Sequence, residues 1–246
     1  MASAPASSQA RLLDLQALDT QLQQLTHARA GISERREAVD VAAELEVTQD
    51  RAVAAATEAS DIARLQARAD DDVQAVRARI ERDKHLMDSG NVAAKELENL
   101  AHEIESLKRR QSELEDTELE IMERLESAQT AHTGYVAQVE ELQARLTSLQ
   151  AAIAARESEL ATQEQQTQTQ RAAVAAEIPA DLLALYEKVR AAGGVGAAML
   201  RQKTCQGCRI TLPESEITRL RATEPDSIER CDNCRCILVR TAESGL

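Results

Sequence analysis

Apolar residues recur at alternating steps of three and four along most of the chain. The longest such pattern runs from Leu97 to Leu160 without a change of register. It forms a seam of about nine heptads, well beyond the three or four that indicate a coiled coil. Polar residues also fall on this seam, where we expect them to fix the alignment of paired helices. They are Gln111, Glu118, His132 and Arg156.

The first half of the chain has a less regular pattern. Its heptad positions are Leu15, Leu18, Leu22, Leu25, Ile32 and Val39, with Arg29 and Arg36 among them. A later group is closer to an eleven-residue repeat and comprises Ile62, Leu65, Ala69, Val73, Val76 and Ile80. An eleven-residue repeat relaxes a left-handed supercoil, so we expect looser winding in this second group.

A short polar segment separates the two patterns. Met87–Asn91, with the sequence MDSGN, contains residues that favour turns and helix caps. The flanking arms, about 8–87 and 92–176, match in length, as an antiparallel pair requires. We therefore interpret residues 1–177 as an antiparallel coiled-coil hairpin with its tip near 87–91. The alternative is an uninterrupted helix that pairs with a second chain.

The pattern changes after the second arm. Ile178 precedes Pro179, and a residue before proline is disfavoured in a helix. Residues 178–198 then read as a short helix with an apolar face and a Gly-rich linker. Residues 199–246 form the last domain, in which short strands are predicted at 209–212, 227–231 and 236–241, with a helical turn at 214–222. The sequence thus predicts a mainly α fold with a small β-rich domain.

Composition and charge narrow the function classes. The chain has no Phe or Trp, two Tyr and a net charge of −13, and its acidic excess lies before Met199. Any contact with nucleic acid is therefore expected in the last domain, since phosphate binding draws on clustered Lys and Arg. No apolar run is long enough to span a bilayer and no secretory signal precedes the first arm, so we expect a cytoplasmic protein.

Four cysteines carry the clearest chemical signal. Cys205, Cys208, Cys231 and Cys234 form two CxxC pairs separated by twenty-two residues. Each pair can present two sulfurs to one ion from a tight turn, which predicts a zinc ribbon with one tetrahedral Zn²⁺. Two disulfides or incidental thiols are the alternative. Gly207 and Asn233 precede the second cysteine of each pair, where a left-handed backbone would help the turn.

The predicted zinc is structural, because four thiolates fill its coordination shell and residues 199–246 contain no His. Cys236 is left over, and we interpret it as a half-buried strand residue; an alternative ligand or a redox-exposed thiol are the other readings. The chain shows no Ser-His-Asp set, phosphate-binding loop or dinucleotide fingerprint, so no enzyme is expected.

Other polar clusters favour solvated helix faces over sites. His27, His85 and His102 are scattered, and Asp70–Asp72 is one acidic run. Basic residues around the cysteines are candidates for phosphate contact, although aromatic stacking residues are missing there. They are Arg201, Lys203, Arg209, Arg219, Arg221, Arg230, Arg235 and Arg240.

The order of these parts resembles the bacterial family of C4-type zinc-ribbon proteins with an N-terminal coiled-coil hairpin, to which the flagellar regulator FlgZ belongs. IPADLLALYEKVR, TCQGCRITLP and IERCDNCRCIL carry the resemblance, which is specific from Ile178 onward. It implies that the four CxxC cysteines bind zinc. Some members are linked to an RpoN-type sigma factor or to messenger RNA. The chain departs from the family pattern after Cys234, where Arg235 and Cys236 replace an expected Gly-Arg.

These observations predict a non-enzymatic, zinc-binding adaptor that binds macromolecular partners through the hairpin and the ribbon. The resemblance implies transcription machinery, RNA polymerase or a sigma factor, as the partner class. The alternative is an RNA- or DNA-binding protein that acts through the ribbon's arginines. We expect a monomer without membrane association.

Overall fold

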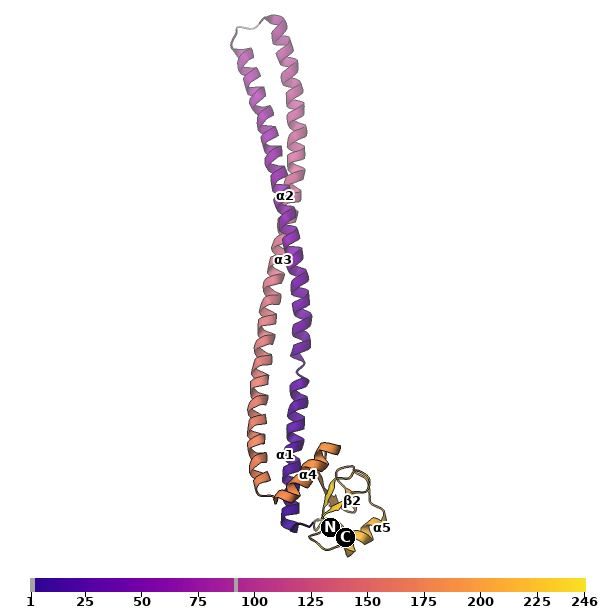
Figure 1. The fold of residues 1–246 in the computed structure, drawn as a ribbon. Coiled ribbons are helices and arrows are strands. Elements are labelled where there is room, and N and C mark those ends of the chain that lie inside the picture. The colour runs from indigo at the N-terminus through magenta and orange to yellow at the C-terminus, as the bar shows by residue number, and fades with distance from the viewer. Residues whose placement is uncertain (1–2, 91–92) are drawn as a thin grey trace. The chain divides into compact units, whose positions relative to one another are not determined.

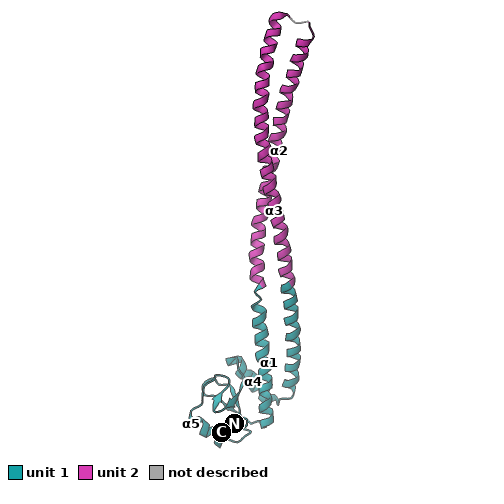
Figure 2. Ribbon diagram, turned by 180° about the vertical axis from the view of Figure 1, so that it is seen from behind, with its two compact units in different colours: residues 1–33, 152–246 teal, residues 34–151 magenta. Residues whose placement is uncertain are grey.

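The computed structural model describes residues 3–90 and 93–246, which form two compact units (Figure 2). Unit 1 comprises residues 1–33 and 152–246, and unit 2 comprises residues 34–151. The long helices form a hairpin and a small strand-containing region follows them, which confirms the predicted fold class (Figure 1). No helix among the described residues is long and apolar enough to cross a membrane.

Unit 2 is a pair of antiparallel helices. It contains α2 (Glu34–Asp88) and the first part of α3 (Ala94–Ala176), which lie side by side in both ribbon views (Figures 1 and 2). On α3, every predicted seam position from Leu97 to Ile153 is buried or half-buried. The prediction is wrong at the next position, because Arg156 is exposed and Glu157 is half-buried in its place, whereas Leu160 is buried as predicted.

The seam of α2 differs from the predicted one. Leu65 and Val39 are exposed, at 42% and 68% of their surface, while Gln66 and Ala38 are at least half-buried in their place. With these two changes, the inward positions of α2 follow steps of three and four from Ala38 to Met87. The expected eleven-residue repeat is therefore wrong, and α2 keeps an ordinary heptad pattern that pairs with the heptads of α3.

The first arm is also interrupted, which the pattern did not predict. α1 (Ala6–Ala30) ends at Gly31, whose N–H donates to the His27 carbonyl, and α2 begins three residues later. Within unit 1, α1 lies along the last part of α3, and Arg11 and Arg29 form ion pairs with Glu177 and Glu164.

The predicted tip falls between α2 and α3. α2 ends at Asp88, the Ser89 hydroxyl donates to the Leu86 carbonyl at 2.7 Å, and Gly90 is left-handed with φ of 73°. Gly tolerates this conformation without the Cβ clash that other residues meet. Asn91, the last residue of the predicted tip, lies outside the described residues.

The last part of unit 1 contains one more helix and a four-stranded sheet. α4 spans Ala180–Gly193 and ends at left-handed Gly194, and α5 spans Glu214–Ala222. The sheet order is β2-β1-β4-β3, with β1 and β4 parallel and the other pairs antiparallel. The strands are β1 (Ala197–Arg201), β2 (Thr204–Cys205), β3 (Glu229–Arg230) and β4 (Ile237–Val239).

Two strand predictions need correction. β1 lies partly in the predicted linker, and the predicted strand 209–212 has one isolated bridge, between Thr204 and Thr211. β1 and β2 are joined by Gln202 and Lys203, both with positive φ. This turn usually requires Asn or Gly, so its residues gave no signal in the sequence.

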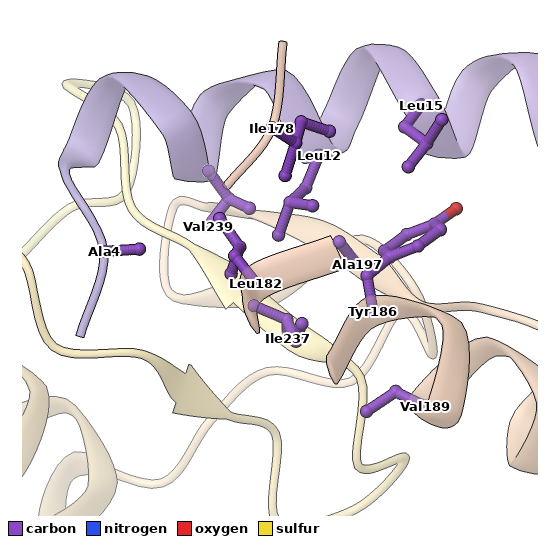
Figure 3. Close-up of a cluster of buried hydrophobic side chains, with 10 residues drawn as sticks. All are labelled: Ala4, Leu12, Leu15, Ile178, Leu182, Tyr186, Val189, Ala197, Ile237 and Val239. Carbon is purple, nitrogen blue, oxygen red and sulfur yellow. The ribbon is translucent and has the colours of Figure 1, made fainter. Parts of the chain in front are cut away.

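The sheet separates two apolar clusters. One cluster joins α1, α4 and the sheet through Leu12, Leu15, Leu182, Tyr186 and Ile237, among other residues (Figure 3). The second cluster joins the sheet to α5 and the cysteines and includes Leu200, Ile217 and Leu238. The apolar face of α4 is therefore covered by the ribbon and α1, and the ribbon folds as part of unit 1.

Candidate metal centre

The two CxxC turns have the same backbone hydrogen bonds. In the first, the Cys205 N–H donates to the carbonyl of Ile210 and the Cys205 carbonyl accepts from the N–H of Arg209. In the second, Cys231 makes the corresponding bonds with Cys236 and Arg235. The four bonds measure between 2.7 and 3.0 Å. Each turn thus places its two cysteines in equivalent positions.

The left-handed residues of these turns are not the predicted ones. Arg209 and Arg235, directly after the second cysteine of each pair, have φ of 61° and 66°, whereas Gly207 and Asn233 do not have positive φ. Left-handed geometry costs a residue with a Cβ about 1 kcal/mol or more. Gly207 is instead tightly packed, because an added Cβ would lie 3.1 Å from Cβ of Ala198 and 3.3 Å from Sγ of Cys236.

The four predicted ligands are brought together. The sulfur atoms of Cys205, Cys208, Cys231 and Cys234 all lie within 4.8 Å of one another. The Sγ atoms of Cys205 and Cys234 are 3.8 Å apart, and those of Cys208 and Cys231 are 3.9 Å apart. Four Zn–S bonds of 2.3 Å in a tetrahedron require sulfur separations of about 3.8 Å. The donor set therefore fits one Zn²⁺, and the five cysteines form no disulfide.

The environment changes the pKa of two ligand thiols in opposite directions. The hydrogen bond from Cys236 lowers the pKa of Cys205 to about 4, assisted by backbone N–H groups of the first turn and opposed by burial. Burial raises the pKa of Cys231 to about 12. Zinc binds thiolates, so its binding to this site releases protons and weakens as the pH falls.

Cys236 is a fifth sulfur beside the metal centre. It is fully buried, directly before β4, and its Sγ lies 3.3 Å from Sγ of Cys234 and 3.7 Å from Sγ of Cys205. The predicted half-buried strand position is wrong, because the thiol packs against two ligands. Hydrogen bonding to Cys205 and burial raise its pKa. Cys236 is not one of the four cysteines whose sulfur atoms all lie within 4.8 Å of one another.

The basic residues around the centre fall into two groups. Arg201, Lys203, Arg219 and Arg221 form ion pairs with acidic side chains of the ribbon. Arg240 donates to five backbone carbonyls around the end of α5.

Among the described residues, Arg209, Arg230 and Arg235 have no ion-pair partner. Arg230 and Arg235 line a hollow of about 230 Å³ together with Cys234 and Lys188 of α4. Lys188 was not predicted to belong to this region, because α4 and β3 are far apart in sequence.

A buried polar network attaches the ribbon to the helices of unit 1. The carboxylate of Asp19 on α1 is 3% exposed, and it accepts hydrogen bonds from Arg171 at 2.7 Å and from the Tyr186 hydroxyl at 2.7 Å. The amide oxygen of Gln16 accepts from the N–H of Gly196 at 2.7 Å. Burial raises the pKa of Asp19, but the donors outweigh it and hold that pKa below its usual value.

The remaining polar candidates do not form sites. His27, His85 and His102 are exposed, and His132 is half-buried on the α3 seam as predicted. The run Asp70–Asp72 is exposed. In the described part of the chain, the cysteines are the sole group of three or more potential metal ligands with converging atoms.

A helical hairpin followed by a four-cysteine ribbon defines the class of protein. The CT398-like coiled coil hairpin domain family matches residues 15–194, and the C4-type zinc ribbon domain family matches residues 204–238. The chain belongs to the CT398-like coiled-coil hairpin family and carries a C4-type zinc ribbon.

Relatives in mycobacteria match most of the chain. The chain is 35% identical to the uncharacterized protein Rv2229c of Mycobacterium tuberculosis, over 95% of this chain and 96% of the relative. It is 28% identical to the uncharacterized protein ML1638 of Mycobacterium leprae, over 86% and 91% of the two chains.

Solved structures share the fold. A structure from Mycobacterium smegmatis has a TM-score of 0.78 and 34% identity, and the match covers 98% of this chain and all of that one. The structure of CT398 from Chlamydia trachomatis has a TM-score of 0.58 over 96% and 98% of the two chains. At 14% identity, this second likeness concerns the fold.

Proposed function

We propose that this protein is a non-enzymatic adaptor, in which a zinc-stabilised ribbon and a coiled-coil hairpin bind macromolecular partners. The observation that carries the proposal is the ligand set. Four cysteine sulfurs at tetrahedral spacing fill the shell of a zinc ion, and such a closed site acts in folding, whereas catalytic zinc keeps an open position.

The organisation of unit 1 supports the adaptor role. The ribbon is attached to α1 and α4 by the apolar cluster, and Gln16 of α1 accepts a hydrogen bond from the Gly196 N–H directly before β1. Asp19 of α1 accepts from the Tyr186 hydroxyl and so joins α1 to α4. Its outer surface, with Arg209, Arg230 and Arg235, is therefore held on a fixed base within unit 1. A docked ribbon offers a preorganised binding surface, which lowers the entropy cost of binding a partner.

The proposed partner class is the transcription machinery, RNA polymerase or a sigma factor. It rests on the resemblance of residues 178–246 to the FlgZ-containing family, some of whose members are linked to an RpoN-type sigma factor. The proposal includes a monomer in the cytoplasm, where a reducing environment favours free, metal-binding cysteines over disulfides.

A binding assay with purified RNA polymerase, with and without sigma factors of the native host, tests the proposal. Deletion of the ribbon is unsuitable, because it would expose Leu12 and Tyr186 of the shared cluster. The full chain is compared instead with a variant in which Arg209, Arg230 and Arg235 are replaced by Glu. Binding by the wild type and loss in the variant support an adaptor that acts through the ribbon. No binding to any of these assemblies contradicts the partner class.

The unpaired arginines also favour a second candidate function, nucleic-acid binding. Arg209 and Arg235 adopt a left-handed backbone conformation beside the metal centre, which costs free energy of folding. No acidic group among the described residues forms an ion pair with them. Of the arginines that the sequence suggested for phosphate contact, Arg209 has no ion-pair partner in the described part of the chain, whereas Arg219 and Arg221 are paired with acids.

Binding to single-stranded RNA at several salt concentrations separates the two functions. Phosphate contacts release counterions, so the logarithm of the affinity falls linearly with the logarithm of salt concentration. For this candidate we expect a steep slope that flattens on replacing Arg209, Arg230 and Arg235 with Gln. A salt-independent affinity, or none, excludes it.

A further inference from the structure

The hairpin of unit 2 has two flanks, one on each side of its apolar seam. Interhelical ion pairs identify them. Arg77 of α2 pairs with Glu115 of α3 on one side, which we name flank A. Arg79–Glu103 and Arg145–Glu37 lie on the other, flank B. In heptad terms, Arg77 and Glu115 occupy e positions, and flank A comprises the e and b positions of both helices. The flank B residues of these pairs occupy g positions, and flank B comprises the g and c positions.

Flank A lacks charge over its middle part. The flank A positions of α2 between Gln49 and Ala67 carry no charged residue, and those of α3 between Leu119 and Val136 carry one, Glu126. All of these positions except Ala56 are exposed, and Ala56 is half-buried. The positions are Gln49, Val53, Ala56, Ser60, Ala63 and Ala67 on α2, and Leu119, Met122, Glu126, Gln129, Thr133 and Val136 on α3.

The apolar members of this surface are unusually open to solvent. Val53 is 67% exposed, Leu119 58% and Met122 44%. Flank B at the same level of α2 has a different character, since four charged residues, Arg51, Glu58, Asp61 and Arg68, stand among two apolar ones, Ala54 and Leu65. An exposed apolar stripe with a single charged residue, on a hairpin that carries many charges, is typical of a protein interaction site.

Acidic residues border the stripe. Asp70, Asp71 and Glu140 stand at its ends, and further acids lie along its edges. None of the bordering acids has an ion-pair partner among the described residues. The bordering acids are Asp50, Asp70, Asp71, Asp116, Glu123 and Glu140, and Glu126 lies within the stripe.

The shape and charge of the stripe select its occupant. It extends over residues 53–67 of α2, about 20 Å at 1.5 Å per residue, which is the length of a helix of about fourteen residues. Two antiparallel helices form a shallow groove into which a third helix can pack its apolar side. The unpaired acids favour basic residues beside that apolar side. They oppose a second copy of this chain, which would place acids against acids.

We infer that the middle part of flank A, which includes Val53, Met122 and Val136, binds an amphipathic helix of a partner protein whose apolar stripe is bordered by Lys and Arg. This inference deepens the proposed adaptor function and rests on it, because it assigns the hairpin's share of partner binding to a defined surface.

Site-specific photocrosslinking in the native host identifies the occupant. A photoreactive amino acid replaces Val136 on flank A of the full chain, and a control chain carries it at Ser127, which lies on flank B. We expect crosslinking from position 136 at least about tenfold above that from position 127. The crosslinked peptide should be basic and carry apolar residues at helical spacing. Crosslinking to another copy of this chain, equal yields from both positions, or an acidic peptide would each overturn the inference.

A matched pair of variants then tests the surface with a synthetic peptide of the crosslinked sequence. Met122→Lys and Leu65→Lys change residues of similar exposure, 44% and 42%, on opposite flanks. We expect Met122→Lys to weaken peptide binding about tenfold or more, because it places a charge in the apolar contact and repels a basic helix. Leu65→Lys should leave the affinity within about twofold. Equal effects of the two variants contradict the inference.

The failure of this inference is distinguishable from the failure of the adaptor function. If the Met122→Lys chain still binds the polymerase or sigma factor with wild-type affinity in the assay above, flank A is not the surface but the adaptor function stands. If the wild-type chain binds none of these assemblies and crosslinks no protein, the adaptor function fails.

Discussion

Replacement of Gly196 by Ala should destabilise the docked ribbon, although the backbone at Gly196 does not have a positive φ. An added Cβ would lie 2.7 Å from Cδ2 of Tyr186 and in closer contact with Cε2 of the same ring. Tyr186 is fully buried, and its hydroxyl donates to Asp19 at 2.7 Å, so the ring cannot move aside without breaking this bond. Overpacking of this kind costs about 1–3 kcal/mol.

Hydrogen exchange at the amide of Ile237 measures this effect locally, because that N–H donates to the Gly196 carbonyl at 2.9 Å. We expect Gly196→Ala to accelerate its exchange about tenfold or more, since about 1.4 kcal/mol corresponds to a factor of ten. Far-UV circular dichroism is less suitable, because the long helices dominate its signal.

Two further variants separate the ring clash from other effects. In combination with Tyr186→Leu, most of the penalty should disappear. In combination with Tyr186→Phe, which retains the ring but lacks the hydroxyl bond to Asp19, part of the penalty should remain. Gly134→Ala is the matched control, because no atom lies within 4 Å of its added Cβ. In the middle of α3 this change should stabilise the helix by about 0.5–1 kcal/mol. A neutral Gly196→Ala, or a penalty that Tyr186→Leu does not alter, would refute the packing argument.

Three other predictions concern the polar contacts of unit 1. Since the folded-state pKa of Asp19 is lowered, its stabilising contribution is present above about pH 4 and is lost as the pH falls below that value. Asp19→Asn should lower the free energy of unfolding by about 3 kcal/mol at pH 7 and reduce its dependence on pH in the acidic range, as measured by chemical unfolding monitored at the ribbon. An unchanged dependence on pH in that range would contradict this role. Arg240→Lys should destabilise the loop after α5 by about 2 kcal/mol, because one ammonium cannot satisfy five carbonyls, and faster amide exchange at Ser227 checks it. Cys236→Ser should retain one zinc per chain while Cys208→Ser loses it, as measured by elemental analysis; zinc loss in the Cys236 variant would place that sulfur among the ligands.

The sequence was sufficient to predict the hairpin and the metal centre because both depend on regular spacing. A seam of nine heptads is compatible with a single arrangement of the helix, with the seam facing inward. The predicted seam positions from Leu97 to Ile153 are buried or half-buried as expected. Two CxxC pairs similarly require their sulfurs to converge, whatever the intervening loop does. The four predicted sulfurs do converge.

Other features depended on partners that are remote in sequence. Gln66 takes an inward position in place of Leu65 because the register is set by the whole α2–α3 pair, and hydrophobicity at one position is a weaker influence. The break at Gly31 was likewise not recognised, since a single Gly inside a helical pattern is tolerated.

The ribbon shows the same limit. Gln202 and Lys203 form a turn that usually requires Asn or Gly, and Arg209 and Arg235 occupy left-handed positions for which Gly is the usual residue. The attachment of α4 to the ribbon through Tyr186 and Asp19 joins three segments far apart in the chain. Composition and periodicity carry no information about such contacts.

Elemental analysis of the purified full chain tests the central claim most directly, which is that four cysteine sulfurs hold one structural zinc ion and thereby shape the ribbon. We expect one equivalent of zinc per chain after extensive dialysis against a metal-free buffer. Well under one equivalent in folded protein would contradict the account.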